Sequence, residues 1–278
     1  MADGISGTSI YNTVFWATMA YFFLKFFLVG NSLPGKLNLI WPLGYLFGMM
    51  ILLIFLNTSY MNSQCGFSNT NTIIVSTVIP WLVIFGLMVS VLAIAPGWKG
   101  PFSNTIGYMV VVMSGGKDSI LNLLKKSPNQ QREADADDKL NILGLVYDNP
   151  APLFNQLNST DFYVGLIKLR PYFKKDVLTF WNENIRVNVD DPDAALKNLL
   201  EKPNSPFKPL WKMVLLKETV SEWVWYLLTA GVVLATSTNI ISNAGCIKSS
   251  SDESEYHSNL INNQNIISNQ KTTQYYET

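Results

Sequence analysis

The sequence predicts an all-α membrane protein of about four transmembrane helices, with a mostly helical soluble domain between the third and the fourth. Charged residues make up 14% of the 278 residues, against about 25% in an average soluble domain. The shortage is local: residues 4–97 carry two charged side chains, Lys25 and Lys36, whereas residues 98–217 carry 16 basic and 13 acidic ones. The predicted divisions are an N-terminal arm (1–12), three transmembrane helices (13–97), a helical soluble domain (98–217), a fourth transmembrane helix (218–242) and a polar, flexible tail (243–278).

Four apolar runs have the length that a membrane-spanning helix needs, about 20 residues for a hydrocarbon core of about 30 Å. They cover residues 13–30, 37–57, 72–97 and 219–241. Lys25 lies near the end of the first run, where a lysine can extend to the lipid headgroups. Glu222 and two tryptophans stand at the entrance of the fourth run. Three long and almost uncharged runs within a hundred residues are typical of a membrane protein rather than of a soluble core.

The lysines that flank these runs predict the orientation of the chain. The connection between the third and fourth runs begins with Lys99 and ends with Lys208, Lys212 and Lys217. Basic residues beside transmembrane segments favour the cytosolic side. We therefore expect residues 98–217 on the cytosolic side of the membrane and both termini on the other side.

Three helices are expected in the second half of the charged middle, over residues 159–173, 174–185 and 190–203. The last has the strongest local signals, because an aspartate can cap its start and Pro192 suits the first helical turn. Lys202 and Pro203 are typical of its end.

The segment VVVMSGGKDSILNLL (110–124) resembles the phosphate-binding loop of ATP pyrophosphatases. In that family, glycine amides at a strand-to-helix turn hold pyrophosphate beside a helix N-terminus, so residues 109–113 would form a strand and residues 120–126 a helix. The loop would consist of Ser114, Gly115, Gly116, Lys117, Asp118 and Ser119. The family's doubly wound sheet needs several βα units, whereas the rest of the middle predicts helices. The alternative is a helix-capping turn after an interfacial segment, in which case changing both glycines to alanine should leave the protein's role intact.

Other catalytic arrangements have less support. His257, the single histidine, lies in the polar tail, which excludes histidine-based triads and most zinc sites. The zero net charge gives no reason to expect nucleic acid as a partner. We predict no catalytic residue, no cofactor and no metal, and hence a protein that is not an enzyme. A membrane-bound ATP pyrophosphatase or ligase remains the alternative, and a small channel or carrier a third hypothesis.

The two cysteines are predicted to lie on the same side of the membrane. Cys65 falls between the second and third runs, and Cys246 follows the fourth. That side would be the oxidising lumen during insertion. A disulfide between them would fasten the last span to the second and third, and two free thiols remain the alternative.

The stretch APGWKGPFSNTIGYMVV (95–111) follows the third run directly. Trp98, Phe102 and Tyr108 are residues of the kind that gathers at the membrane surface. The stretch resembles a segment in a membrane protein of nucleocytoplasmic large DNA viruses, which have an internal membrane beneath an icosahedral capsid. The matching residues are Pro96, Gly97, Trp98, Pro101, Phe102, Ser103, Asn104, Thr105, Gly107 and Tyr108.

The resemblance implies a structural virion protein of the membrane-anchored minor capsid type, which ties the inner membrane to the capsid shell of a giant virus. Its expected partners are the lipid bilayer, other capsid proteins and a second copy of itself. Its expected location is the virion inner membrane and, during assembly, membrane derived from the host endoplasmic reticulum. Aromatic and basic groups in the middle domain are candidate capsid contacts, with Phe173 and Trp181 as core residues the open alternative. These candidates are Tyr172, Phe173, Lys174, Lys175 and Trp181.

Overall fold

The computed structural model describes residues 7–29, 40–125, 149–185 and 191–244. These residues form helices and connecting turns, and an isolated bridge between Leu124 and Phe173 is their only β-type pairing. The prediction of a mostly helical chain is therefore confirmed for the described part. Three of its helical stretches are long and apolar enough to cross a membrane: Ile40–Cys65, Thr70–Ile94 and Lys208–Asn243.

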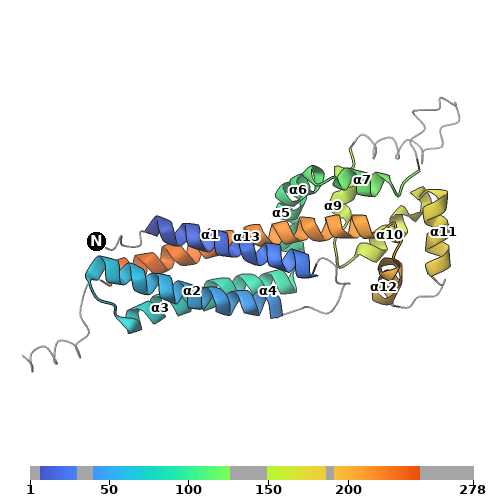
Figure 1. The fold of residues 1–278 in the computed structure, drawn as a ribbon. Helices are drawn as coiled ribbons and strands as arrows, with labels where there is room; N and C mark the ends of the chain where they lie inside the picture. Colours follow the sequence, from blue (N-terminus) through green and yellow to red (C-terminus); the bar gives the residue numbers. More distant parts are fainter. Residues whose placement is uncertain (1–6, 30–39, 126–148, 186–190, 245–278) are drawn as a thin grey trace, which may run out of the picture.

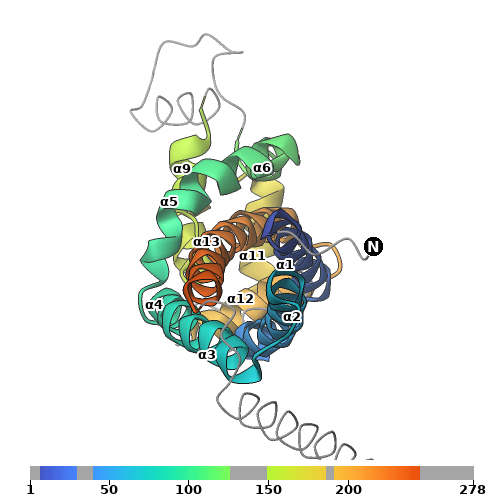
Figure 2. The same ribbon diagram turned by 90° about the vertical axis from the view of Figure 1, so that its left-hand side faces the viewer.

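A bundle of long helices forms one half of the molecule (Figures 1 and 2). It contains α1 (Gly7–Val29), α2 (Ile40–Cys65), α3 (Thr70–Pro80), the π-helix η1 (Trp81–Phe85), α4 (Gly86–Ile94) and the second half of α13 (Lys208–Asn243). The start of α1 and the end of α13 lie at the same end of the bundle, and the shorter helices lie at the other end (Figure 1).

The third predicted span is one helical stretch with a widened turn inside it. The side chain of Asn69 caps its start by accepting a hydrogen bond from the Thr72 amide at 3.3 Å. Pro80 lies in the middle, and the π-helical turn begins at the next residue. A proline supplies no amide donor and its ring crowds the preceding turn, and insertion of a wide turn relieves such crowding.

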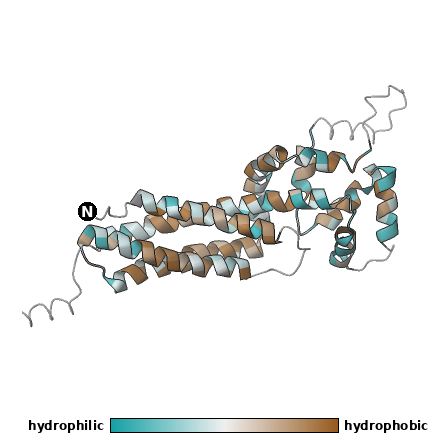
Figure 3. Cartoon of the chain, viewed as in Figure 1, coloured by the Kyte–Doolittle hydropathy of each residue, from teal (hydrophilic) through white to brown (hydrophobic). Residues whose placement is uncertain are grey.

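Aromatic rings fill the centre of the bundle. Trp81 and Phe85 stack with their centroids 4.7 Å apart, and the ring of Tyr226 meets Phe85 edge to face at 5.0 Å. The Trp81 indole donates a hydrogen bond to the Leu46 carbonyl at 2.8 Å, so this buried polar group has a partner. The outer surface of the bundle is largely apolar (Figure 3): Ile51 is 71% exposed, for example. A lipid-facing surface has this composition.

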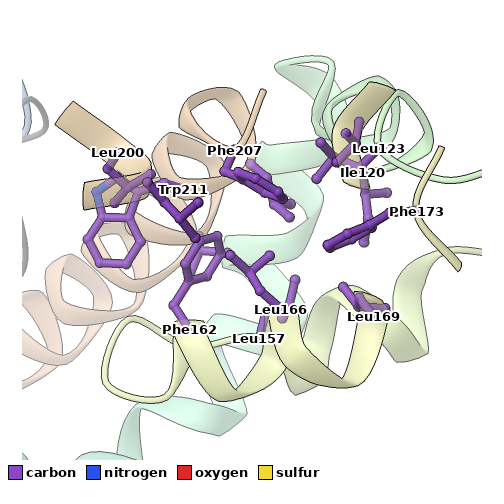
Figure 4. Packing of buried hydrophobic residues seen from close by; sticks show 14 of the residues in the cluster. Ile120, Leu123, Leu157, Phe162, Leu166, Leu169, Phe173, Leu200, Phe207 and Trp211 are labelled. Carbon is purple, nitrogen blue, oxygen red and sulfur yellow. The ribbon is translucent and has the colours of Figure 1, made fainter. Parts of the chain in front are cut away.

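Short helices at the other end surround the first half of α13. They are α7 (Gly116–Leu121), α9 (Ala151–Gln156), α10 (Phe162–Leu169), α11 (Lys175–Asn184) and α12 (Pro192–Glu201). Their buried residues form a second apolar core, to which Phe162, Phe173 and Phe207 each contribute a fully buried ring (Figure 4). We call this half the helical domain.

The three helices expected in the helical domain are present. The region 159–173 contains α10 followed by a 3-10 turn, Arg170–Tyr172, that includes Pro171. The region 174–185 contains α11, and 190–203 contains α12. At the start of α12 the Asp191 carboxylate accepts hydrogen bonds from the amides of Asp193 (2.9 Å) and Ala194 (3.3 Å). This is the capping that the sequence predicted.

Helix α13 runs without a break through both halves of the molecule. It has 36 residues, which corresponds to about 54 Å at 1.5 Å per residue. The expected start of the fourth span at residue 218 therefore lies inside a helix that begins ten residues earlier, at Lys208. The apolar run at residues 219–241 corresponds to the part of α13 that lies in the bundle. The part of α13 that lies in the helical domain precedes this run.

Candidate functional site

Residues 95–108, the junction segment, cross α13 where the bundle meets the helical domain (Figures 1 and 2). The segment contains η2 (Pro96–Lys99), α5 (Gly100–Phe102) and η3 (Ser103–Gly107), and it continues into α6 (Tyr108–Met113). Helix α4 ends at Ile94, and Pro96 follows two residues later. A residue that precedes a proline is disfavoured in the α conformation, which explains why the chain leaves the span here and turns.

One face of α13 receives the junction segment. The Trp225 indole donates to the Trp98 carbonyl at 3.0 Å, and the Ser221 hydroxyl donates to the Lys99 carbonyl at 2.7 Å. One turn earlier on α13, the Lys217 ammonium donates to the Asn104 side-chain oxygen at 3.4 Å. Residues four apart lie on one face of a helix. Positions 217, 221 and 225 therefore form a row that binds the segment along its length.

Three charged groups meet beside this row. The Glu222 carboxylate accepts a hydrogen bond from the Lys99 ammonium at 2.5 Å and another from the Lys25 ammonium. The three side chains come from α13, from the junction segment and from α1, so the cluster joins three parts of the chain. Burial lowers the pKa of Lys99, but the adjacent carboxylate outweighs this effect and the pKa is raised overall. Lys99 is therefore held in its charged form.

Gly107 allows the junction segment to approach α13 closely. A Cβ atom at this position would lie 2.4 Å from the Lys217 carbonyl oxygen and 3.2 Å from its carbonyl carbon. Both are backbone atoms of a long helix, which cannot move aside as a side-chain end can. Residue 107 must therefore be glycine for the segment to pack as it does.

Two neighbouring residues of α13 bind the loop between α9 and α10. The buried Lys217 ammonium donates to the carbonyl oxygens of Leu157 (2.8 Å) and Phe154 (3.1 Å). The Glu218 carboxylate accepts from the amide (2.6 Å) and the hydroxyl (2.5 Å) of Ser159. Hydrogen bonds to charged groups are stronger than those between neutral ones. The Lys217 ammonium thus joins the helical domain and the junction segment at one point of α13.

The three aromatic residues expected at the membrane surface, Trp98, Phe102 and Tyr108, lie in two different environments. Trp98 and Phe102 gather around Trp225, with centroid distances of 6.1 and 5.1 Å. Tyr108 instead packs against Phe154 in the helical domain at 6.0 Å, and burial raises the pKa of its hydroxyl. Trp98, Phe102 and Trp225 therefore form the aromatic cluster at the junction. Trp225 was not among the expected residues, although it lies at the predicted entrance of the fourth span.

The SGGKDS turn connects two helices, α6 and α7, so the strand that the phosphate-loop hypothesis requires at residues 109–113 is replaced by a helix. Gly115 has φ +79°, a conformation that favours glycine. A Cβ atom on Gly116 would lie 2.1 Å from a methyl group of Val111, and the Ser119 hydroxyl donates to the Gly116 carbonyl at 2.7 Å. The glycines are explained by the helix-to-helix turn. Alanine at positions 115 and 116 is therefore expected to strain this turn, so the double substitution would change the local packing whether or not ATP binds there.

The remaining polar groups of the turn point outward. Ser114, Lys117 and Asp118 are exposed. Helix α7 has six residues, and the segment before it is helical rather than extended, so the local context of an ATP pyrophosphatase loop is absent here.

The candidate capsid contacts differ in their exposure. Phe173 and Trp181 are buried in the core of the helical domain, and this corrects their assignment as surface contacts. Tyr172 and Lys174 are partly exposed and Lys175 is exposed. Periodicity could have placed only one of these residues, because Val177 and Trp181 lie four residues apart on one face of α11. Phe173 lies before that helix in an extended conformation, and no helical spacing indicates its burial.

The structure describes one of the two cysteines. Cys65, at the end of α2, is disulfide-bonded. Cys246 lies outside the described residues, so the pairing of the two remains a prediction. Among the residues that the structure describes, no group of three histidine, cysteine, aspartate or glutamate side chains could hold a metal ion.

Comparisons with known proteins returned no match. No family model matches the chain, and no curated protein and no solved structure is similar to it.

Proposed function

We propose that the chain is a structural membrane anchor, in which a helix bundle crosses a bilayer and holds the helical domain at a fixed distance from one membrane surface. The observation that carries this proposal is the continuity of α13. About 20 residues of a helix suffice to cross the hydrocarbon core, so about 16 of its 36 residues extend beyond the membrane. An unbroken helix that is anchored at both ends transmits force and position, which a flexible linker does not.

The junction contacts support a rigid connection rather than a hinge. The junction segment is bound to α13 at positions 217, 221 and 225, and the ion cluster adds α1 to the same point. A domain that moved relative to the bundle would have to break these contacts.

Four spans are part of the proposal. Helix α1 has 23 residues, about 35 Å, and lies beside α13, where Phe22 meets Tyr226 edge to face at 5.0 Å. On its other side, Trp16 and Phe27 are exposed. A helix with an apolar outer surface beside three candidate spans has the properties of a fourth. Both termini would then lie on the side opposite the helical domain.

The docking face that we propose is on α10. Val164 and Ile167 are 42% and 47% exposed there, and Lys168 and Arg170 are exposed beside them. Exposed aliphatic groups bordered by basic side chains suit a protein partner with an acidic rim. From the resemblance of the junction segment, we propose that this partner belongs to a viral capsid and that the chain is a minor capsid protein of the virion inner membrane.

The orientation can be tested with two single-cysteine variants, Lys175→Cys in the helical domain and Tyr11→Cys near the start of α1, in a background with both native cysteines replaced. In sealed microsomes, an impermeant maleimide should label position 175 from outside and position 11 only after the membrane is opened. If position 11 is labelled in sealed vesicles, the start of α1 lies on the same side of the membrane as the helical domain, and the four-span arrangement is wrong.

The docking face can be tested in virions. Ile167→Asp should release the protein from capsids that have been stripped with detergent, whereas Thr179→Asp, an exposed position on α11, should leave it bound. Both variants should unfold at the wild-type temperature, since neither side chain is buried. Equal retention of the two variants would contradict docking through α10.

The ATP-binding alternative gives a separate test. Any ligand that binds the folded state and not the unfolded one must raise the free energy of unfolding, by RT ln(1 + L/Kd), where L is the free ligand concentration. On the structural proposal, millimolar ATP with magnesium leaves the unfolding temperature of the solubilised protein unchanged. A saturable increase would overturn the structural proposal in favour of a nucleotide-binding one.

A further inference from the structure

An apolar groove lies on the outer surface of the bundle between α4 and α13. Its volume is about 360 Å³, within the range of small-molecule sites. The stretch of η1 and α4 contributes five aliphatic or methionine side chains, and α13 contributes two aliphatic side chains and Thr229, with the rings of Trp98 and Trp225 at one end. The lining residues are Ile84, Leu87, Met88, Val91, Leu92, Trp98, Trp225, Leu228, Thr229 and Val232.

The groove lies within two of the candidate membrane spans. From Trp225 to Val232 it follows α13 for seven residues, about 10 Å. One leaflet of a bilayer contributes about half of the hydrocarbon thickness of about 30 Å, so the groove fits within a single leaflet. The two tryptophans mark its end at the headgroup level, where such rings gather.

The charges at this end of the groove are not balanced. Lys99 follows Trp98 directly, and Glu222 lies one helical turn from Trp225. The described cluster carries two positive charges, Lys25 and Lys99, and one negative charge, Glu222. The two lysine side chains remain 18% and 22% exposed, so an anionic group from outside can reach them.

We propose that the groove holds an acyl chain of an anionic phospholipid, with the headgroup phosphate beside the Lys25–Glu222–Lys99 cluster. The apolar lining matches the chain, and the net positive charge at the tryptophan end matches the headgroup. A bound lipid would fill the gap between α4 and α13 just below the junction segment. This inference requires the bundle to lie in a membrane but does not depend on a capsid partner.

The experiment uses the full chain in nanodiscs of phosphatidylglycerol and phosphatidylcholine with identical acyl chains, followed by gentle transfer to detergent and native mass spectrometry. The wild type should retain phosphatidylglycerol in preference to phosphatidylcholine. Leu228→Trp, which fills the groove, should reduce the retained lipid several-fold. Its matched control is Ile51→Trp, at an exposed position on α2 that does not line the groove, and it should retain lipid as the wild type does.

The headgroup is tested by Lys99→Gln, which makes the cluster neutral. One basic residue at a membrane surface contributes about a five-fold preference for anionic lipid, and this variant should lose it. Lys212→Gln, an exposed lysine of the helical domain, should keep it. If the wild type retains the two lipids equally, the headgroup assignment is wrong. If Leu228→Trp retains as much lipid as the wild type, the groove is not the lipid-binding site. A third outcome is a wild-type protein that is dimeric and carries no lipid, together with a monomeric Leu228→Trp variant. This outcome would mean that a second copy of the chain, and not a lipid, occupies the groove.

Discussion

The bundle and the helical domain have similar interiors and opposite surfaces. Each is filled with aromatic rings, Trp81 and Phe85 in the bundle and Phe173 and Phe207 in the helical domain. The outer surface of the bundle is apolar, whereas most charged side chains of the described chain lie on the helical domain (Figure 3). On the proposed function, this difference corresponds to lipid around the bundle and water around the helical domain. A surface that contacts lipid needs no polar side chains, whereas a domain in water buries its apolar side chains and exposes polar ones.

Helix length follows the same difference. The candidate spans have 25 to 36 residues, while the described helices α7, α9, α10, α11 and α12 have 6 to 10. A backbone in hydrocarbon must satisfy all its hydrogen bonds internally, so its helices are long. In water, helices this short are not stable alone and depend on packing. The helical domain should therefore unfold when its core is opened, and the bundle should tolerate changes on its outer surface.

The sharpest test of this comparison exchanges the same residue type in both halves. Phe207→Ala removes a fully buried ring that contacts Phe173, Phe180 and Trp181, and should lower the free energy of unfolding by about 4 kcal/mol. Phe55→Ala removes a bundle ring that is 68% exposed and should cost little in detergent. Stability is measured by circular dichroism during titration with a denaturing detergent. Similar losses for both would mean that the bundle surface is covered in the folded protein.

The next effect concerns the junction that joins the two halves. Glu222→Gln keeps the size of the side chain but leaves Lys25 and Lys99 without a carboxylate, which should cost about 3 kcal/mol for a cluster of this burial. The control is Glu201→Gln, which breaks an exposed pair with Lys197 at 3.7 Å and should cost about 0.5 kcal/mol or less. The denaturant titration above measures both. Equal losses would show that the ion cluster does not stabilise the junction.

A smaller effect is expected where the junction segment approaches α13. Gly107→Ala places a methyl group against the Lys217 backbone and should cost about 2 kcal/mol by overpacking. Gly100→Ala is the control, because a Cβ atom there meets nothing within 4 Å. Limited proteolysis of the solubilised protein would also show faster cleavage in residues 95–113 for Gly107→Ala alone. If Gly100→Ala behaves in the same way, close approach is not the reason for glycine at 107.

The sequence predicted the helices well because their signals are local. The length of the apolar runs identified α2 and the stretch Thr70–Ile94, and the Asp191–Pro192 pair identified the start of α12. Exposure was harder to predict. Phe173 and Trp181 were assigned to the surface by residue type, although the four-residue spacing of Val177 and Trp181 on α11 indicated that Trp181 faces the core.

The candidate site was predicted only in part, because its contacts join residues far apart in the sequence. Trp98 and Phe102 were recognised as residues of a membrane surface, but their shared partner is Trp225, more than 120 positions away. Lys25 and Glu222 were both noticed as ionisable residues in apolar runs. Such residues usually pair with one another inside a membrane, and this rule could have joined them. Nothing local indicates that Lys99 completes the cluster or that Gly107 lies against Lys217.

The smallest effect concerns polar groups inside the bundle. The Asn57 side-chain amide donates to the hydroxyls of Thr77 and Ser237, both at 2.8 Å, and so links α2, α3 and α13. Hydrogen bonds between transmembrane helices contribute about 0.6 kcal/mol each on average, so Asn57→Ala should cost about 1 kcal/mol. The control is Thr58→Ala, since the Thr58 hydroxyl donates to the Ile54 carbonyl of its own helix. A loss for Asn57→Ala no larger than for Thr58→Ala would mean that packing alone joins the three helices. A loss above about 3 kcal/mol would instead match a buried polar network in a water-facing domain, and the contrast between the two halves would then be confined to their surfaces.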